Sequence, residues 1–209
     1  QLSLIVLDEN RAKITWTTPQ TGANGGWIDA SALTYKITRL PDSIVVAETT
    51  TGNEYIDNSI TKLNIYSYQI QAITPDGAGP TATTDRLVMG PALTVPYRCN
   101  FATDDQFALW NVIDANNDKY TWKRETTLAA AYYYYNEDGE TGGDDWLVSS
   151  PIHLEKDKIY RLKFKLQSYD VGYPEKVAVH LGTGASVAEQ TTLLGDYEIE
   201  SNTFVEYKV

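Results

Sequence analysis

Hydrophobic and polar residues alternate along several short stretches of the chain, which is the pattern of β-strands with one buried face. Residues 12–19 alternate around Ile14 and Trp16, and residues 33–40 alternate in the same way. Turn-forming clusters such as the Gly- and Pro-rich residues 75–80 separate these stretches at intervals of about 8–12 residues. The pattern predicts a β-sandwich in the first half of the chain. The clearest predicted strands there are residues 2–7, 12–19, 33–40, 66–74 and 81–89.

The second half of the chain shows the same alternation. Residues 159–169 alternate hydrophobic residues, on the face expected to be buried, with Arg161, Lys163 and Lys165 on the other face. Strands are predicted over residues 107–114, 121–127, 128–136, 146–154, 159–169, 174–184 and 203–209.

A short connector divides the two halves. Residues 90–97 carry two prolines and a glycine, which is typical of a link between domains. We therefore predict an all-β chain with two sandwiches. They cover residues 1–92 and 99–209, with a linker over residues 93–98.

Composition excludes several classes of partner. The chain has 209 residues, with 28 acidic and 17 basic side chains and a net charge of −11. This balance argues against nucleic acid and against anionic membrane surfaces, because both need a basic face. No apolar run reaches 18 residues, so we expect no membrane insertion. Cys99 is the single cysteine, so the chain forms no internal disulfide. The first residue is Gln and not Met, so we expect a trimmed piece of a larger multidomain chain.

Three aromatic residues of the first half stand in a familiar order. They are Trp16 in "ITWTTP", Tyr35 in "LTYKITR" and Tyr66 in "YSYQIQAIT", followed by "DGAGP". In this order the segment resembles a fibronectin type III domain, an immunoglobulin-like sandwich. The resemblance implies that Trp16 and Tyr35 pack between the sheets. It also implies that the Tyr66 hydroxyl bonds to upstream backbone.

Three phrases of the second half carry another resemblance: "WNVIDANNDKYTW", "DDWLVSSPIHLEKDKIYRLKF" and "PEKVAVHLGTG". They look like the cleaved-adhesin, or choice-of-anchor J, domains of secreted and surface proteins of Bacteroidetes. That family has a jelly-roll sandwich related to MAM and galactose-binding-like domains, and we expect Trp122 and Trp146 in its core. Family members continue for two or three strands beyond a segment like residues 203–209. We therefore expect the second sandwich to lack its last strands.

The loop "IDANNDKYTW" places oxygen atoms at alternate positions, as a calcium site needs. They belong to Asp114, Asn116, Asp118 and the carbonyl of Tyr120. An EF-hand needs glycine where Lys119 stands, and it needs flanking helices, so this is not an EF-hand.

A calcium site of another kind remains open, because the cleaved-adhesin domains are calcium-binding modules. Asp144 and Asp145, in a second acidic loop, could supply further oxygen ligands. The alternative is a plain polar turn, in which Asp and Asn side chains bond to their own backbone. Apart from calcium, we expect no essential cofactor.

The run "AAAYYYYN" offers the candidate ligand surface. On a strand, Tyr133 and Tyr135 face one way, opposite to their neighbours. With Trp110 they could line a shallow groove for a sugar or a peptide, because flat aromatic rings suit such ligands. The alternative is that all of these rings pack inside the sandwich.

Catalytic signatures are missing from the sequence. The two histidines, His153 and His180, lie in strand patterns, and Cys99 lies next to the linker. No zinc-protease, nucleophile-elbow or phosphate-loop motif occurs. We therefore expect no enzyme.

The sequence thus favours a non-catalytic adhesion protein, secreted or on the outer-membrane surface, that binds a host or matrix protein or a glycan. In this view the first sandwich is a spacer and the second carries the recognition surface. One alternative is a carbohydrate-binding accessory module of a larger glycan-degrading or proteolytic enzyme. A second alternative is a structural spacer without any ligand.

Overall fold

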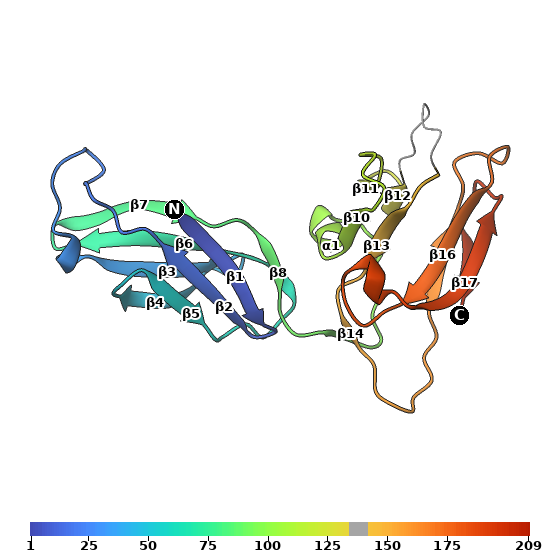
Figure 1. Ribbon diagram of the computed structural model, residues 1–209, viewed down its shortest axis with the longest axis horizontal. Coiled ribbons are helices and arrows are strands. Elements are labelled where there is room, and N and C mark those ends of the chain that lie inside the picture. The colour runs from blue at the N-terminus through green and yellow to red at the C-terminus, as the bar shows by residue number, and fades with distance from the viewer. Residues whose placement is uncertain (134–141) are drawn as a thin grey trace. The chain divides into compact units, whose positions relative to one another are not determined.

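The computed structural model describes residues 1–133 and 142–209 (Figure 1). The chain is all-β, as the sequence predicted, and its strands pair antiparallel. Contacts along the chain divide it into two compact units, Gln1–Leu93 and Thr94–Val209. Within the described part, no helix is long and apolar enough to span a membrane.

The N-terminal unit contains two antiparallel sheets. One has the strand order β1-β2-β5, and the other has the order β4-β3-β6-β7, with β8 paired to β6. A single 3-10 turn, Ala30–Ala32, precedes β3. The strands are β1 (Leu2–Asp8), β2 (Arg11–Trp16), β3 (Thr34–Leu40), β4 (Ile44–Thr50), β5 (Glu54–Asp57), β6 (Asn64–Thr74), β7 (Gly77–Thr83) and β8 (Leu87–Met89).

The core of this unit lies between its two sheets. Trp16 on β2 is 7% exposed and Tyr35 on β3 is 2% exposed, and their ring centroids lie 4.9 Å apart. Because the two residues belong to different sheets, their contact shows that the sheets face each other as a sandwich. The alternation predicted for residues 33–40 is confirmed, since every second residue of β3 is buried. The buried cluster consists of Ala12, Ile14, Trp16, Leu33, Tyr35, Ile37, Ile60, Tyr66, Tyr68, Ile70 and Met89.

Tyr66 lies in this core and still satisfies its polar atom. It is 4% exposed, and its hydroxyl donates to the carbonyl oxygen of Lys62 at 2.9 Å. This upstream bond is the one that the sequence predicted. The guanidinium of Arg39 lies over the Tyr66 ring, 5.3 Å from its centroid.

Replacing Tyr66 with phenylalanine is expected to lower the free energy of unfolding by about 1 kcal/mol, because only the hydroxyl and its hydrogen bond are lost. Urea unfolding of the full chain measures the difference. The matched control is Tyr169→Phe, since that ring is exposed, and we expect no change there. Equal stability of the Tyr66 variant and the unmodified protein would contradict a stabilising role for this bond.

A buried ion pair also crosses the N-terminal core. Arg39 is 4% exposed and Asp57 is 1% exposed, and their charged atoms lie 3.0 Å apart. The hydroxyl of Tyr68 donates to the same carboxylate oxygen of Asp57 at 2.7 Å. The alternation placed Arg39 on the buried face, and these partners explain how its charge is tolerated there.

The C-terminal unit consists of short two-stranded ladders. The pairs are β10–β13, β11–β12, β15–β18 and β16–β17. Among the described residues of this unit, Ile199 is the one fully buried hydrophobic residue. The prediction that this sandwich lacks its last strands stays a prediction. The elements from the unit boundary onward are β9 (Leu93–Thr94), α1 (Asp104–Ala108), β10 (Asn111–Asp114), β11 (Trp122–Glu125), β12 (Ala130–Tyr133), β13 (Asp145–Val148), β14 (Ile152–His153), β15 (Lys163–Leu166), β16 (Glu175–Leu181), the 3-10 turn Val187–Glu189, β17 (Thr192–Ile199) and β18 (Val205–Lys208).

Several strands of this unit are shorter than the alternation predicted. Residues 159–169 form a strand only over β15, and Leu162 is 45% exposed instead of buried. Residues 146–154 are split into β13 and β14 around Pro151, which has no backbone N–H to give to a ladder. Of the predicted 128–136 strand, residues 128 and 129 lie in a turn instead, residues 130–133 form β12, and residues 134–136 lie outside the described residues.

The helix α1 was not predicted, although the sequence holds a signal for it. The Thr103 side chain accepts from the backbone N of Gln106 at 3.2 Å, and the Gln106 side chain accepts from the backbone N of Ala102 at 2.8 Å. A Thr followed three residues later by Gln is a helix-capping pattern. Hydrophobic periodicity could not show this helix, because it has only five residues.

Candidate functional site

The loop that joins β10 to β11 closes on itself through its own side chains. Asp114 accepts backbone hydrogen bonds from Asp118 at 3.1 Å and from Lys119 at 2.8 Å. Asp118 in turn accepts from the backbone N of Tyr120 at 2.8 Å. Asn117 and Lys119 have positive φ angles of 57° and 72°, which a tight polar turn requires. These bonds are those of a polar turn, one of the two alternatives from the sequence.

Strand pairing brings the second acidic loop beside this turn. In the β10–β13 ladder, Asp114 lies opposite Asp145. The backbone N of Ala115 donates to the carbonyl of Asp144 at 3.0 Å, and Asn116 donates to the carbonyl of Gly142 at 3.3 Å. The predicted oxygen ligands therefore gather in one region, although about 30 residues separate them in sequence.

Asp145 is the unusual member of this group. Both of its carboxylate oxygens are buried, and neither has a hydrogen-bond partner among the described residues. Burial, together with the negative charges of Asp114 and Asp118, raises the pKa of Asp145 above its ordinary value. The hydroxyls of Thr121 and Tyr133 lie near enough to offset part of this rise, but they do not reach hydrogen-bond geometry. Within the described part of the chain, the carboxylate is thus a buried anion without a cation or a hydrogen-bond donor in bonding geometry.

The negative charge of Asp145 also affects the pKa of the neighbouring Tyr133. Burial and the charge of Asp145 raise the pKa of Tyr133 to about 12, with further contributions from Asp118 and Glu175. Its hydroxyl lies so close to Gly143 that a Cβ there would clash with it. Tyr133 therefore closes one side of the acidic region.

The oxygen atoms of this region suit a hard cation, but in their described positions they do not form a metal site. All candidate side-chain ligands are oxygen atoms, and the unpartnered Asp145 carboxylate is the kind of group that Ca²⁺ binds. Within residues 1–133 and 142–209, however, no three His, Cys, Asp or Glu side chains stand together as metal ligands. The carboxylate of Asp144 already accepts a hydrogen bond from the indole N–H of Trp146 at 2.8 Å. Calcium therefore stays a prediction.

The predicted aromatic groove residues are packed against other rings. The ring centroid of Tyr133 lies 5.8 Å from that of Trp122, and Trp110 lies 5.2 Å from Phe101. Tyr133 and Trp110 are both half-buried. Tyr135 lies outside the described residues, so its part in a groove is left as predicted.

The two tryptophans expected in the second core are half-buried instead. The Trp122 indole N–H donates to the carbonyl of Asp145 at 3.2 Å. Trp146 packs edge-on against His180, with ring centroids 5.1 Å apart. Both indoles therefore donate hydrogen bonds to the acidic region, Trp122 to Asp145 and Trp146 to Asp144, instead of lying in a closed core.

Among the described residues of this unit, the most exposed aromatic side chains lie elsewhere, in what we call the aromatic loop, residues 168–173. Tyr169 is 86% exposed, Val171 63% and Tyr173 73%. The alternation in the sequence predicts Tyr169 as the end of a strand. The turn residues Asp170 and Gly172 were the missed signal, because they break a strand and leave its apolar residues uncovered.

Hydrogen bonds brace the aromatic loop at its base and across its turn. Ser168, 1% exposed, anchors its base by donating from its backbone N to Ser201 at 2.8 Å. The side chain of Asp170 accepts from the backbone N of Gly172, and its carbonyl accepts from that of Tyr173, both at 3.2 Å. The loop thus presents its exposed rings on a fixed base.

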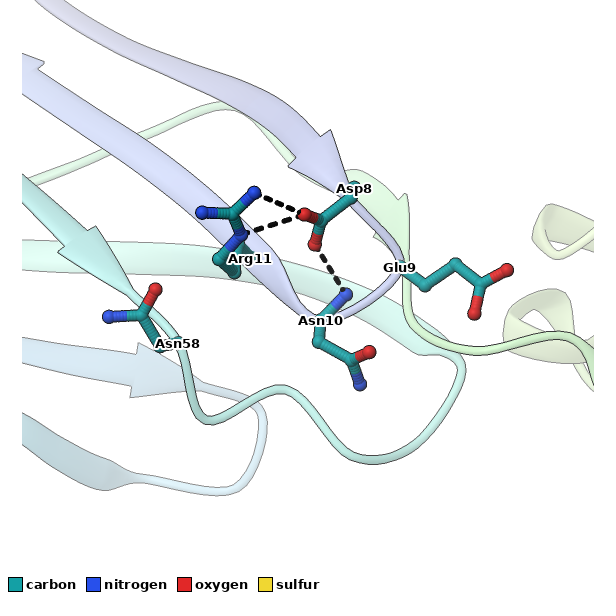
Figure 2. A pocket seen from close by; sticks show the side chains of 5 residues that line it. All are labelled: Asp8, Glu9, Asn10, Arg11 and Asn58. Atoms are coloured by element: carbon teal, nitrogen blue, oxygen red, sulfur yellow. Dashed lines mark hydrogen bonds and ion pairs between the residues drawn. The ribbon is translucent and has the colours of Figure 1, made fainter.

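Figure 2 shows a shallow pocket of the N-terminal unit at the turn between β1 and β2. The carboxylate of Asp8 lies between the guanidinium of Arg11, at 2.6 Å, and the backbone N of Asn10, at 3.0 Å, while Glu9 points away from them. Because these charged groups are exposed and neutralise each other, the pocket offers little to a ligand. Asn58 completes its rim.

The residues with nucleophilic or acid–base chemistry are dispersed. His153 is exposed on β14, and Nδ1 of His180 lies 3.0 Å from the carbonyl of Gln190. Cys99 is half-buried with a free thiol, and it helps to raise the pKa of Tyr97 to about 12, after burial as the first cause. None of the contacts described for these three side chains links one to another.

Comparison with known proteins gives little further guidance. No family and no curated protein matches the chain. Among solved structures, one described as "Myokine structure" aligns with 43% of this chain and 89% of its own length, at 13% sequence identity and a TM-score of 0.27. A likeness of that size carries no argument about fold or function.

Proposed function

We propose that the chain is a non-catalytic adhesion protein, secreted or held at the outer-membrane surface, that binds a host or matrix protein or a glycan. In this proposal the N-terminal unit is a fibronectin type III-like spacer. The C-terminal unit is a jelly-roll domain of the cleaved-adhesin kind, and it carries the recognition surface.

The aromatic loop is the observation that carries this proposal. Three largely apolar side chains are 63–86% exposed, although their burial would stabilise the fold, and the hydrogen bonds of the loop hold them in this position. Tyrosine supplies a large contact area with few rotatable bonds, which is why it dominates many recognition surfaces. Tyr169 and Tyr173 are therefore the residues that we expect to contact the ligand.

Calcium has a structural part in this proposal. The oxygens of Asp145, Asp114 and Asp118 would hold the ion, with further oxygens from Asn116, Tyr120 or Asp144. Bound Ca²⁺ supplies positive charge that offsets the repulsion among these carboxylates. The unpartnered carboxylate of Asp145 supports this assignment.

Replacing both Tyr169 and Tyr173 with serine is expected to weaken ligand binding by about tenfold or more, since a central interface tyrosine contributes about 2 kcal/mol. The measurement is retention of the full chain on a glycan array and on immobilised matrix proteins. The matched control is Ile159→Ser, which removes an equally exposed apolar side chain outside the loop.

The pattern of retention separates the alternatives. Binding to neutral glycans alone favours an accessory module of a glycan-degrading enzyme. Lack of retention on every surface favours a structural spacer and removes the adhesion proposal. Equal loss in the Ile159 control would show that the aromatic loop is not the recognition surface.

A further inference from the structure

The outer face of the β15–β18 ladder carries four cationic side chains, which we call the basic strip: Arg161, Lys163, Lys165 and Lys208. Lys163 lies directly opposite Lys208 in the ladder, and Lys165 lies opposite Glu206. Backbone bonds between Leu162 and Val209, at 3.1 and 3.0 Å, extend the ladder to the residue next to Arg161. All four side chains of the strip are exposed.

The charges of the basic strip are poorly neutralised. Lys163 forms a long ion pair of 3.3 Å with Glu206, and both side chains are about half exposed. In the part of the chain that the structure describes, no carboxylate lies within ion-pair distance of the other three cationic groups. Like charges directly opposite each other on a ladder are destabilising. The Lys163–Lys208 pair therefore costs stability, in a chain with 28 acidic and 17 basic residues.

The opposite face of the same ladder supplies its stability. Phe164 stacks on Tyr207 with ring centroids 5.9 Å apart, and Tyr197 of β17 packs edge-on against both, at 5.3 and 5.1 Å. This aromatic cluster joins the β15–β18 and β16–β17 ladders. Folding thus relies on the aromatic face, and nothing in the packing requires cations on the outer face.

The length and width of the basic strip indicate the shape of ligand that fits it. Alternate residues on a strand lie about 6.6 Å apart, and neighbouring strands about 4.8 Å apart, so the strip is about 13 Å long and two strands wide. Lysine is a compact point charge that suits single sulfate or carboxylate groups. A thin polymer with repeated negative charges fits this outline.

The net negative charge of the chain also limits which anionic ligands the basic strip can bind. Charges further away than about 8–10 Å are screened at physiological salt, so a thin chain lying on the strip experiences mainly its four cations and the carboxylate of Glu206 beside them. A membrane surface or duplex nucleic acid extends well beyond the strip, and the net charge of −11 on the chain opposes the approach of so large an anionic surface. We propose that the basic strip binds a linear anionic polysaccharide, sulfated or carboxylated. This inference does not depend on the aromatic loop.

The test compares binding of the full chain to fluorescent dextran sulfate and to uncharged dextran. We expect binding to dextran sulfate alone, and we expect it to weaken between about 50 mM and about 200 mM salt, because binding releases counterions. The triple variant Lys163→Gln, Lys165→Gln, Lys208→Gln is expected to lose about tenfold or more of the affinity. The control Lys13→Gln, Lys36→Gln, Lys62→Gln makes the same charge change in the N-terminal unit and should bind as before.

Three results would overturn the proposal. They are no binding of the unmodified chain to dextran sulfate at low salt, an equal loss in the control variant, and equal binding to anionic vesicles or duplex DNA. Circular dichroism verifies that the triple variant is folded, and the single variant Lys165→Gln, which keeps the Lys163–Glu206 ion pair, serves if it is not. The Tyr169 and Tyr173 double variant should keep its affinity for dextran sulfate, so the two sites can fail separately.

Discussion

Replacing Asp57 with alanine is expected to lower the free energy of unfolding of the N-terminal unit by about 3–5 kcal/mol, because it breaks a buried ion pair from one side. The carboxylate accepts hydrogen bonds from Arg39 at 3.0 Å, from Tyr68 at 2.7 Å, and from the hydroxyl and backbone N of Ser59 at 2.6 and 2.8 Å. Alanine leaves the buried hydroxyl of Tyr68 without this acceptor. It also leaves Asp42 as the remaining carboxylate partner of Arg39, at 2.7 Å.

The matched control is an ion pair on the surface of the same unit. Lys36 and Glu48 lie 3.2 Å apart, and the Glu48 side chain is 73% exposed. We expect Glu48→Ala to cost less than about 1 kcal/mol, since water solvates both charges. Urea unfolding of both variants in the full chain gives the comparison. Equal costs would show that the buried position of Asp57 adds nothing.

The same network predicts a dependence on pH. Burial alone would raise the pKa of Asp57, but hydrogen bonds from Ser59 and Tyr68 and the charge of Arg39 outweigh it and hold the pKa below its ordinary value. A carboxyl group with a lowered folded pKa stabilises the fold above its unfolded pKa of about 3.9, and this stability is lost as the pH falls below it. Unfolding followed from pH 7 down to about pH 2 should show this loss in the unmodified chain. The Asp57→Ala variant should show a smaller loss.

Calcium is expected to stabilise the C-terminal unit, and Asp145→Asn is expected to abolish that effect. An ion that binds only the folded state adds about 2.7 kcal/mol at a hundredfold excess over its dissociation constant. The buried, unpartnered carboxylate of Asp145 is the ligand whose loss should matter most. Thermal unfolding with calcium and with EDTA measures the shift in each protein.

The behaviour in EDTA makes this prediction more specific. The pKa of Asp145 is raised, first by burial and then by Asp114 and Asp118, so its ionised form destabilises the fold at neutral pH. Asp145→Asn should therefore be more stable than the unmodified chain in EDTA, and this gain should vanish as the pH falls and Asp145 is protonated. The matched control is Asp157→Asn, an exposed acid of the same unit, which should keep the calcium shift. No calcium shift in the unmodified chain would remove the metal proposal.

The N-terminal core could be predicted closely from the sequence. Alternation placed Ile14, Trp16, Tyr35 and Ile37 on buried faces, and all four are buried. The reason is physical: side chains on a strand alternate between two faces, so one covered face leaves a period of two in the sequence.

The candidate sites of the C-terminal unit were less predictable. The sequence grouped Asp114, Asn116 and Asp118 because they are neighbours along the chain, and the structure keeps them in one turn. It could not show that Asp145 is buried without a partner, because this depends on the β10–β13 register and on Tyr133 and Thr121 around it.

Exposure was the other property that only the tertiary structure decided. The sequence predicted a ligand surface at the run of tyrosines around Tyr133, whereas the described Tyr133 packs on Trp122. Among the described residues of the C-terminal unit, Tyr169 and Tyr173 are the most exposed rings. Likewise, the alternation put Lys163 and Lys165 on an outer face, but the cross-strand register added Lys208 and made a strip. Local sequence determined the faces of the strands, since that depends on backbone geometry alone. Which faces were covered, and which charges met, depended on segments that are distant in the sequence and are brought together only by folding.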